Sequence, residues 1–279
     1  MKYKFASADF TFPLLEHDKV IKLVGLLGFD GIDIGLFENR GHLQPSAVFS
    51  NTAQNGKLLK RKTEDSGIVV ADVFLQCDID FEPKAINHPD AKIRAQARDW
   101  FLHTLEYANA CGSKHVTCLP GVHFEAEDYE TSFARAKEEL AWRALRAKDA
   151  GLIFGTETHL GSLGDTPQKT ERLMRETKGL TLTLDYTHFA TVGIPDSEVE
   201  PLIKYATHFH ARGAAKGVLQ AVVAENTIDY ARIVEVMQEV GYKGFIGVEY
   251  IWMEWQNANR VDNISEGIQL REIMKKAMK

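Results

Sequence analysis

The amino-acid sequence predicts an α/β protein that folds as a single (β/α)8 barrel, and three observations support this class. The chain has 279 residues, close to the roughly 250 that are typical of one such barrel. Eight apolar, strand-like runs alternate with segments of helical periodicity, a pattern typical of parallel strands because each helix returns the chain to the same end of the sheet. The turn after the first strand lacks the glycine-rich phosphate sequence of a doubly wound sheet, the competing architecture.

The first four strands are expected at residues 3–8, 31–36, 68–74 and 115–119. Between the first two, the apolar residues Val20, Val24 and Leu27 recur with helical spacing, and Gly28 is expected to end that helix. Asp33 lies inside the second apolar run. It is expected either to point into the barrel or to be solvated at the end of the strand.

Two polar segments interrupt this half of the chain. Residues 40–55, broken by Pro45, are expected to form an active-site loop or an irregular helix, and residues 78–89 are expected to form another long loop. A helix along residues 93–108 ends at Gly112. Long loops on a barrel are usually where the substrate is held.

The second half of the chain repeats the same unit more regularly. Its strands are expected to end at Glu157, Asp185, His210 and Glu249. The helices between them are expected before Gly151, from Thr166-Pro167 onward, at 196–206 and at 228–240. In the helix before Gly151, the periodicity directs Phe133, Leu140, Ala144 and Ala147 to the core and Glu138, Glu139, Arg143 and Lys148 to solvent.

Composition and charge exclude several classes of protein. The formal net charge of −6 gives no electrostatic reason to expect binding to nucleic acid or to an anionic membrane. No apolar run approaches the roughly 20 residues of a membrane-spanning helix. The three cysteines cannot all pair with each other, which favours a reducing cytoplasm. No linker divides the chain, so residues 1–279 are expected to form one cytoplasmic domain.

Four successive strands end in residues that bind metals, namely Glu157, Asp185, His210 and Glu249. Neighbouring members are separated by about one strand–helix unit, and a barrel brings the carboxyl ends of its strands to one face. Three carboxylates and one imidazole suit one Mn²⁺, Mg²⁺ or Co²⁺ ion. Any one of them taken alone is explained as well by capping a helix or pairing with a basic side chain, but all four together favour a metal site.

The sequence also resembles a known family at its strand ends. The similar segments are Gly28–Asp33, Thr156–His159, Leu184–His188, His208–Arg212 and Gly247–Tyr250. They resemble the xylose isomerase-like TIM-barrel superfamily, and within it the sugar phosphate isomerases and epimerases, a branch that includes ketose 3-epimerases and inosose dehydratases. The likeness covers nearly the whole chain in element order and is most specific from Glu157 onward.

The resemblance implies roles for particular residues. Glu157, Asp185, His210 and Glu249 match the family's metal ligands, and Glu157 and Glu249 also match the catalytic pair of the epimerases. His188 falls on the position that binds a substrate oxygen beside the metal. A homodimer or homotetramer is also implied.

Further substrate contacts are expected after strands seven and eight. Lys216 lies roughly where the ketose epimerases have an arginine, and Arg212 has no obvious counterpart there. Both either hold a substrate phosphate or carboxylate or form a solvated face. Trp252 and Trp255 suit stacking on a sugar or on a flat aglycone, or packing in a loop or subunit interface. His208 is expected to line the barrel.

These residues predict an enzyme that acts on a carbohydrate. A divalent ion polarises a carbonyl, one glutamate removes the proton beside that metal-bound carbonyl to give an enediolate, and the other returns a proton. This describes an isomerase or epimerase. The alternative is a dehydratase or β-eliminating lyase that uses the same metal site on a 3-oxo sugar, a keto-inositol or a C3-oxidised glycoside. Nucleic-acid repair would require more histidines and a basic surface, and the retained glutamates argue against a non-catalytic sugar-binding barrel.

Overall fold

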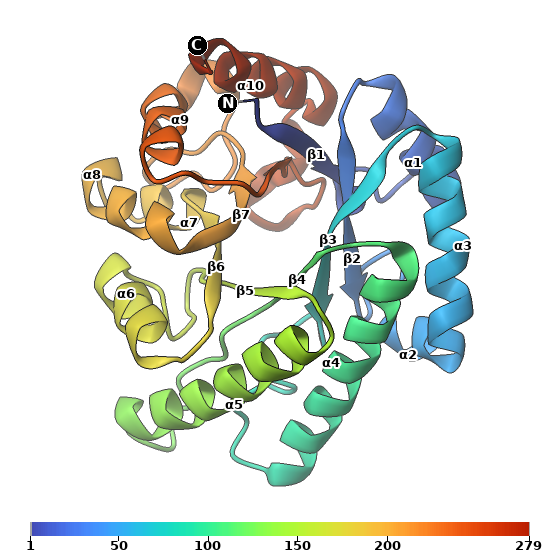
Figure 1. Ribbon diagram of the computed structural model, residues 1–279. Coiled ribbons are helices and arrows are strands. Elements are labelled where there is room, and N and C mark those ends of the chain that lie inside the picture. The colour runs from blue at the N-terminus through green and yellow to red at the C-terminus, as the bar shows by residue number, and fades with distance from the viewer. Residues whose placement is uncertain (1, 279) are drawn as a thin grey trace.

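The computed structural model describes residues 2–278, apart from the side chains of Trp255 and Gln256. Eight parallel strands form a closed barrel, in which β8 pairs with β1 (Figure 1). They are β1 (Lys4–Ala8), β2 (Gly31–Phe37), β3 (Val69–Gln76), β4 (His115–Cys118), β5 (Ile153–Glu157), β6 (Thr181–Asp185), β7 (Ala206–Ala211) and β8 (Phe245–Val248). The predicted (β/α)8 barrel is therefore confirmed.

Helices surround the barrel on its outer side (Figure 1). The α-helices are α1 (His17–Leu26), α2 (Pro45–Val48), α3 (Thr52–Asp65), α4 (Ala91–Cys111), α5 (Tyr129–Asp149), α6 (Pro167–Glu176), α7 (Thr187–Thr191), α8 (Asp196–Val199), α9 (Tyr230–Glu239) and α10 (Asn263–Ala277). Short 3-10 helices are η1 (Asp9–Thr11), η2 (Phe49–Asn51), η3 (Glu200–Tyr205), η4 (Val223–Glu225) and η5 (Trp255–Arg260). The last helix, α10, packs next to the first strand and so completes the outer layer of helices. Its Lys275 ammonium lies 5.8 Å from the centre of the Phe5 ring on β1.

Local sequence explains where several helices begin and end. Thr166 caps α6 by accepting a hydrogen bond from the backbone N–H of Lys169 at 3.2 Å, and Pro167 occupies the first turn, where its missing N–H costs nothing. Gly112 follows α4 with φ of 87°, a left-handed conformation that favours glycine. These boundaries agree with the sequence predictions.

The structure departs from the sequence prediction at one predicted segment and at two helices. The helix expected at 196–206 is split into α8 and η3, because Pro201 has no N–H to continue the α-helical hydrogen bonds. Residues 40–55 contain α2, η2 and the start of α3, so the expected irregular helix is present there. The final helix α10 and the short α7 had no counterpart in the sequence prediction.

The placement of Glu139 and Arg143 in solvent was wrong, because each is 1% exposed. One turn apart on α5, they form an ion pair with Arg143 Nη1 2.9 Å from Glu139 Oε2. Arg98 on α4 also donates to Glu139, with Nε at 2.9 Å from Oε2. The neighbouring helix therefore supplies the charge that makes this burial possible. Glu138, the adjacent residue, is exposed as predicted.

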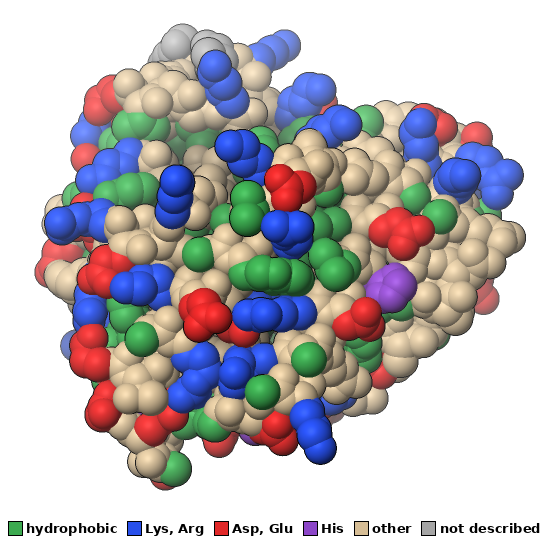
Figure 2. Space-filling view, turned by 60° about the horizontal axis from the view of Figure 1, so that its bottom comes forward, with side chains coloured by type: hydrophobic (Ala, Val, Ile, Leu, Met, Phe, Trp, Pro, Cys, Tyr) green, Lys and Arg blue, Asp and Glu red, His purple; other side chains and the backbone are tan. Residues whose placement is uncertain are grey.

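The outer surface mixes charges of both signs. On the face shown in Figure 2, lysines and arginines are interspersed with aspartates and glutamates, and no large area of one sign is visible there. Across the described part of the chain, every helix is too short or too polar to cross a membrane.

We predict that Glu139→Ala lowers the free energy of unfolding by about 3–5 kcal/mol, because it leaves the Arg143 guanidinium buried without its carboxylate. Glu138→Ala is the matched control, since it removes an exposed carboxylate from the same helix and should change the free energy of unfolding by about 0.5 kcal/mol or less. Chemical denaturation of both variants checks this. Equal effects of the two substitutions would contradict the assigned ion pair.

Candidate metal centre and substrate cavity

The four predicted metal ligands lie at the carboxyl ends of consecutive strands. Glu157 and Asp185 are the last residues of β5 and β6, His210 is near the end of β7, and Glu249 directly follows β8. Asp185 and His210 are paired in register across β6 and β7. The backbone N–H of Glu249 donates to the carbonyl of Ala211, which continues the β7–β8 pairing beyond the strand and fixes the position of Glu249.

His210 lies between the two glutamates. Its Nδ1 is 2.5 Å from Glu157 Oε1 and 3.1 Å from Glu249 Oε2. All three side chains are buried. Ligand atoms of Glu157, His210 and Glu249 lie within 4.8 Å of one another, and so do those of Glu157, Asp185 and His188. The two groups share Glu157, so the predicted ligands form one continuous cluster.

Asp185 is held by a separate set of contacts. Its Oδ1 accepts hydrogen bonds from the N–H and hydroxyl of Thr187 at 2.8 and 2.7 Å. Its Oδ2 lies 3.1 Å from Arg212 Nη2 and 3.5 Å from His188 Nε2. Arg212 Nε donates in turn to the Thr187 hydroxyl. Sequence reasoning assigned Arg212 to substrate, whereas the structure pairs it with a predicted metal ligand.

The electrostatics of the cluster follow from burial and close charges. Burial alone would lower the pKa of His210, but Glu249 and Glu157 raise it well above its usual value. Burial raises the pKa of Glu157 to about 7. For Asp185, burial opposes ionisation, but Arg212 and His188 lower the pKa overall. The two glutamates therefore favour the protonated, positively charged form of His210.

The donor set fits a divalent cation. Two carboxylate oxygens and an imidazole nitrogen converge, and His188 Nδ1 is buried nearby without a hydrogen-bond partner among the described residues. Oxygen-rich shells with one imidazole suit Mg²⁺, Mn²⁺ or Co²⁺. A bound ion would satisfy the carboxylates that now depend on His210 and Arg212.

A layer of polar side chains inside the barrel lies beneath this cluster. Asp33 is buried and its Oδ2 is 3.1 Å from His208 Nε2, which confirms the inward alternative for Asp33 and the barrel-lining position of His208. Asp72 Oδ1 is 2.6 Å from His115 Nδ1. Gly247 leaves the space for this layer, because a Cβ there would collide with Asp33 Oδ2.

A cavity of about 160 Å³ opens above the cluster. Glu157, Glu249, His188 and Arg212 form its polar end. The rest of its wall consists mainly of apolar side chains and includes one pair of polar residues that sequence reasoning missed, Arg40 and Gln76. These remaining lining residues are Phe10, Pro13, Phe37, Arg40, Gln76, Phe81, Leu119, His159, Leu160, Ile251, Trp252 and Met253.

The other residues that the sequence predicts to contact the substrate have different outcomes in the structure. Trp252 lines the cavity, as a substrate contact requires. Lys216 is exposed and is not among the lining residues, because the turn after β7 directs its side chain onto Gly193. The structure therefore does not bring Lys216 to the site. The side chain of Trp255 lies outside the described residues.

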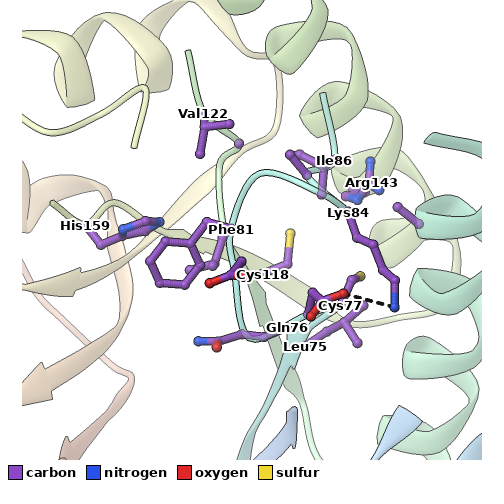
Figure 3. A pocket seen from close by; sticks show the side chains of 16 residues that line it. Leu75, Gln76, Cys77, Phe81, Lys84, Ile86, Cys118, Val122, Arg143 and His159 are labelled. Carbon is purple, nitrogen blue, oxygen red and sulfur yellow. Dashed lines mark ion pairs between the residues drawn. The ribbon is translucent and has the colours of Figure 1, made fainter. Parts of the chain in front are cut away.

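A second, smaller cavity of about 30 Å³ adjoins the first (Figure 3). Phe81 and His159 line both cavities, and their ring centres are 4.4 Å apart. The far side of the smaller cavity carries Cys77 and Cys118. Burial raises the pKa values of these thiols to about 11 and about 12. Both thiols are therefore protonated at neutral pH. The space suits a water molecule rather than a sugar, so the larger cavity is the candidate substrate site.

Comparison with known proteins gives one family match. Residues 21–274 match the family model described as a xylose isomerase-like TIM barrel. An uncharacterized protein of Methanocaldococcus jannaschii is 25% identical over 213 residues, which are 70% of this chain and 66% of that protein. The match therefore spans just under two thirds of the relative's length.

Solved structures share the fold. A D-tagatose 3-epimerase-like protein superimposes with a TM-score of 0.76 at 21% identity, covering 99% of this chain and 97% of that one. A xylose isomerase-like TIM-barrel protein of Mycobacterium smegmatis, solved in complex with magnesium, gives 0.74 at 14% identity, covering 100% and 98%. At sequence identities this low, the likeness to these structures shows a shared fold and nothing more.

We predict that Mn²⁺ at about 100 times its Kd stabilises the protein by about 2.7 kcal/mol, which corresponds to an increase in Tm of about 5 °C. Glu249→Gln should abolish the increase, because it removes one anionic ligand. Asp72→Asn is the control, since it neutralises a buried, histidine-paired carboxylate outside the cluster and should retain the increase. Differential scanning fluorimetry of the metal-free proteins measures both. An undiminished increase in Glu249→Gln would contradict the assignment.

Proposed function

Because the chain belongs to the family of xylose isomerase-like TIM barrels, we propose that it is a divalent-metal-dependent sugar isomerase or epimerase. One observation carries the proposal. Two glutamates from different parts of the barrel, Glu157 and Glu249, both contact His210 Nδ1. Both also line the cavity above it. The fold shared with a D-tagatose 3-epimerase-like protein supports a carbohydrate substrate.

In this proposal Glu157, Asp185, His210 and Glu249 hold the metal ion. When bound, the ion stabilises the negative charge that develops on a carbonyl oxygen as the neighbouring carbon loses its proton. Arg212 and Thr187 fix the Asp185 carboxylate, since they occupy both of its oxygens. Such fixed contacts around a ligand orient it and set its charge before the metal arrives.

The two glutamates divide the proton transfers. Both line the cavity, and each carries one carboxylate oxygen near His210. One ionised carboxylate removes the proton beside the carbonyl, and the other, protonated, returns a proton to the carbon or to the neighbouring oxygen. Return to the carbon from the opposite side inverts it, which is epimerisation.

We assign the binding of a substrate hydroxyl to His188. It lines the cavity, and its Nδ1 has no hydrogen-bond partner among the described residues. Burial lowers its pKa to about 4, so the ring is neutral at physiological pH and offers one donor and one acceptor. Phe37, Phe81 and Trp252 form apolar walls that limit the access of water to the reacting carbon.

Elimination is the second function that this site supports. Its first step is the same proton abstraction, and it differs only when the β-carbon carries a leaving group. The residues of the site are common to both reactions, so the substrate decides between them. The expected dimer or tetramer and the expected cytoplasmic location stay predictions.

We predict hydrogen exchange at carbon. The Mg²⁺-loaded protein, incubated in D₂O with a panel of ketoses, keto-inositols and 3-oxo-glycosides, should incorporate deuterium beside the carbonyl of its substrate, as measured by proton NMR. Inversion at that carbon identifies an epimerase, and loss of water or of an aglycone identifies a lyase. No exchange in any member of the panel, with metal bound, would contradict the proposed chemistry.

Glu157→Gln and Glu249→Gln should each lower turnover by about 10²–10⁴-fold, since each removes a proton-transfer group. Metal content measured in parallel separates the loss of the ion from the loss of proton transfer. Asp72→Asn serves again as the control and should retain turnover. Near-wild-type turnover in either glutamine variant would exclude the two-carboxylate mechanism.

A further inference from the structure

Arg40 is a cationic side chain in the cavity wall that the proposed reaction does not use. It follows β2 and is partly buried among Phe37, Gln76 and the other lining residues. No ion pair of Arg40 is present within the described part of the chain. Its contacts are neutral: Nη2 donates to Gln76 Oε1 at 2.6 Å, and the guanidinium carbon lies 4.8 Å from the centre of the Phe37 ring.

These neutral contacts hold the guanidinium in place. Burial lowers the pKa of Arg40, and the charges of Glu249 and Glu157, which lie beyond ion-pair distance, raise it. Phe37 is itself packed against Phe10, with ring centres 4.8 Å apart. Gln76 extends from the end of β3, and Figure 3 shows its amide on the side of Phe81 and His159, away from Lys84. A guanidinium has five N–H donors, and one is used at Gln76. The remaining donors are free to bind a ligand.

The charge balance of the site leaves Arg40 in excess. Glu157, Asp185 and Glu249 carry at most three negative charges, which a divalent ion and Arg212 would balance. A partly buried charge is normally compensated by an opposite one. With the metal ion on those carboxylates, Arg40 remains the cationic group of the cavity wall that has no ion pair among the described residues and is open to the substrate.

The position of Arg40 in the barrel indicates which end of a bound sugar would reach it. It extends from the loop after β2, whereas the predicted metal ligands extend from β5 to β8. In the closed barrel β2 lies across from β6, which carries Asp185. A sugar that reaches from the metal ligands across the cavity therefore presents its far end to Arg40.

We propose that Arg40 binds an anionic group of the substrate, a carboxylate or a phosphate monoester, at the end of the sugar away from the reacting carbon. The substrate is thus an acidic sugar. This inference rests on the proposed function for the placement of the reacting end. Planar guanidinium groups bind both anions through two parallel hydrogen bonds, so the structure assigns the charge, and the experiment distinguishes the two anions.

The test compares three ligands that differ only at C6: D-fructose, D-fructuronate and D-fructose 6-phosphate. Their Kd values for the Mg²⁺-loaded protein are measured by isothermal titration calorimetry. At least one anion should bind about 10- to 100-fold more tightly than D-fructose, as expected for charge-assisted hydrogen bonds. The tighter of the two anions identifies the source of the charge.

Variants connect this preference to Arg40. Arg40→Gln should remove the preference for the anion while leaving the Kd of D-fructose within about threefold, and Arg40→Lys should retain part of it. Arg175→Gln, which removes an exposed arginine of α6, is the matched control and should keep the full preference. Because the anions also have access to the metal ion, the Arg40→Gln result separates binding by Arg40 from binding by the metal.

Three results would overturn the proposal. They are equal Kd values for the three ligands, a preference that persists in Arg40→Gln, and no measurable binding of either anion. The failure of the proposed function gives a different pattern, in which the anion preference depends on Arg40 but no member of the substrate panel exchanges hydrogen in D₂O.

Discussion

The convergence of two carboxylates on one buried imidazole, with a third carboxylate next to them, is the constraint on which this site depends. Barrel closure brings the ends of β5 to β8 together, and Glu157 and Glu249 both contact His210 Nδ1. Buried like charges repel strongly unless a cation lies among them. Arg212 compensates Asp185, and a proton raises the charge of His210. A divalent ion would perform the same task and release His210 to act as a neutral ligand.

The inside of the barrel is built to keep this cluster in place. His210 is flanked by His208, whose ring centre lies 5.2 Å away, and His208 is fixed by Asp33. His115 and Asp72 form a second pair deeper in the barrel. Gly247 makes room for them where any larger side chain would collide with Asp33. The Asp33–His208 pair therefore supports His210 in the way that hydrogen-bonded neighbours support metal ligands in other proteins.

Much of this arrangement could be predicted from sequence because the signals are local. Each strand is a short apolar run in the sequence, and the polar residue that ends the run can be identified from the sequence alone. The sequence therefore predicts both the barrel and the group at Glu157, Asp185, His210 and Glu249. Arg40 was not singled out, since its importance depends on Phe37, Gln76 and the far side of the cavity. Lys216 was assigned to the substrate by resemblance, but the turn after β7 directs it to solvent.

The most direct test of the central claim is a crystal structure of the protein soaked in Mn²⁺, with anomalous scattering measured near the manganese absorption edge. The account predicts one strong anomalous peak within bonding distance of Glu157, Asp185, His210 and Glu249, at about 2.0–2.6 Å from their oxygen and nitrogen ligands. A peak between Asp33 and His208, or no peak at all at a saturating concentration of Mn²⁺, would contradict it.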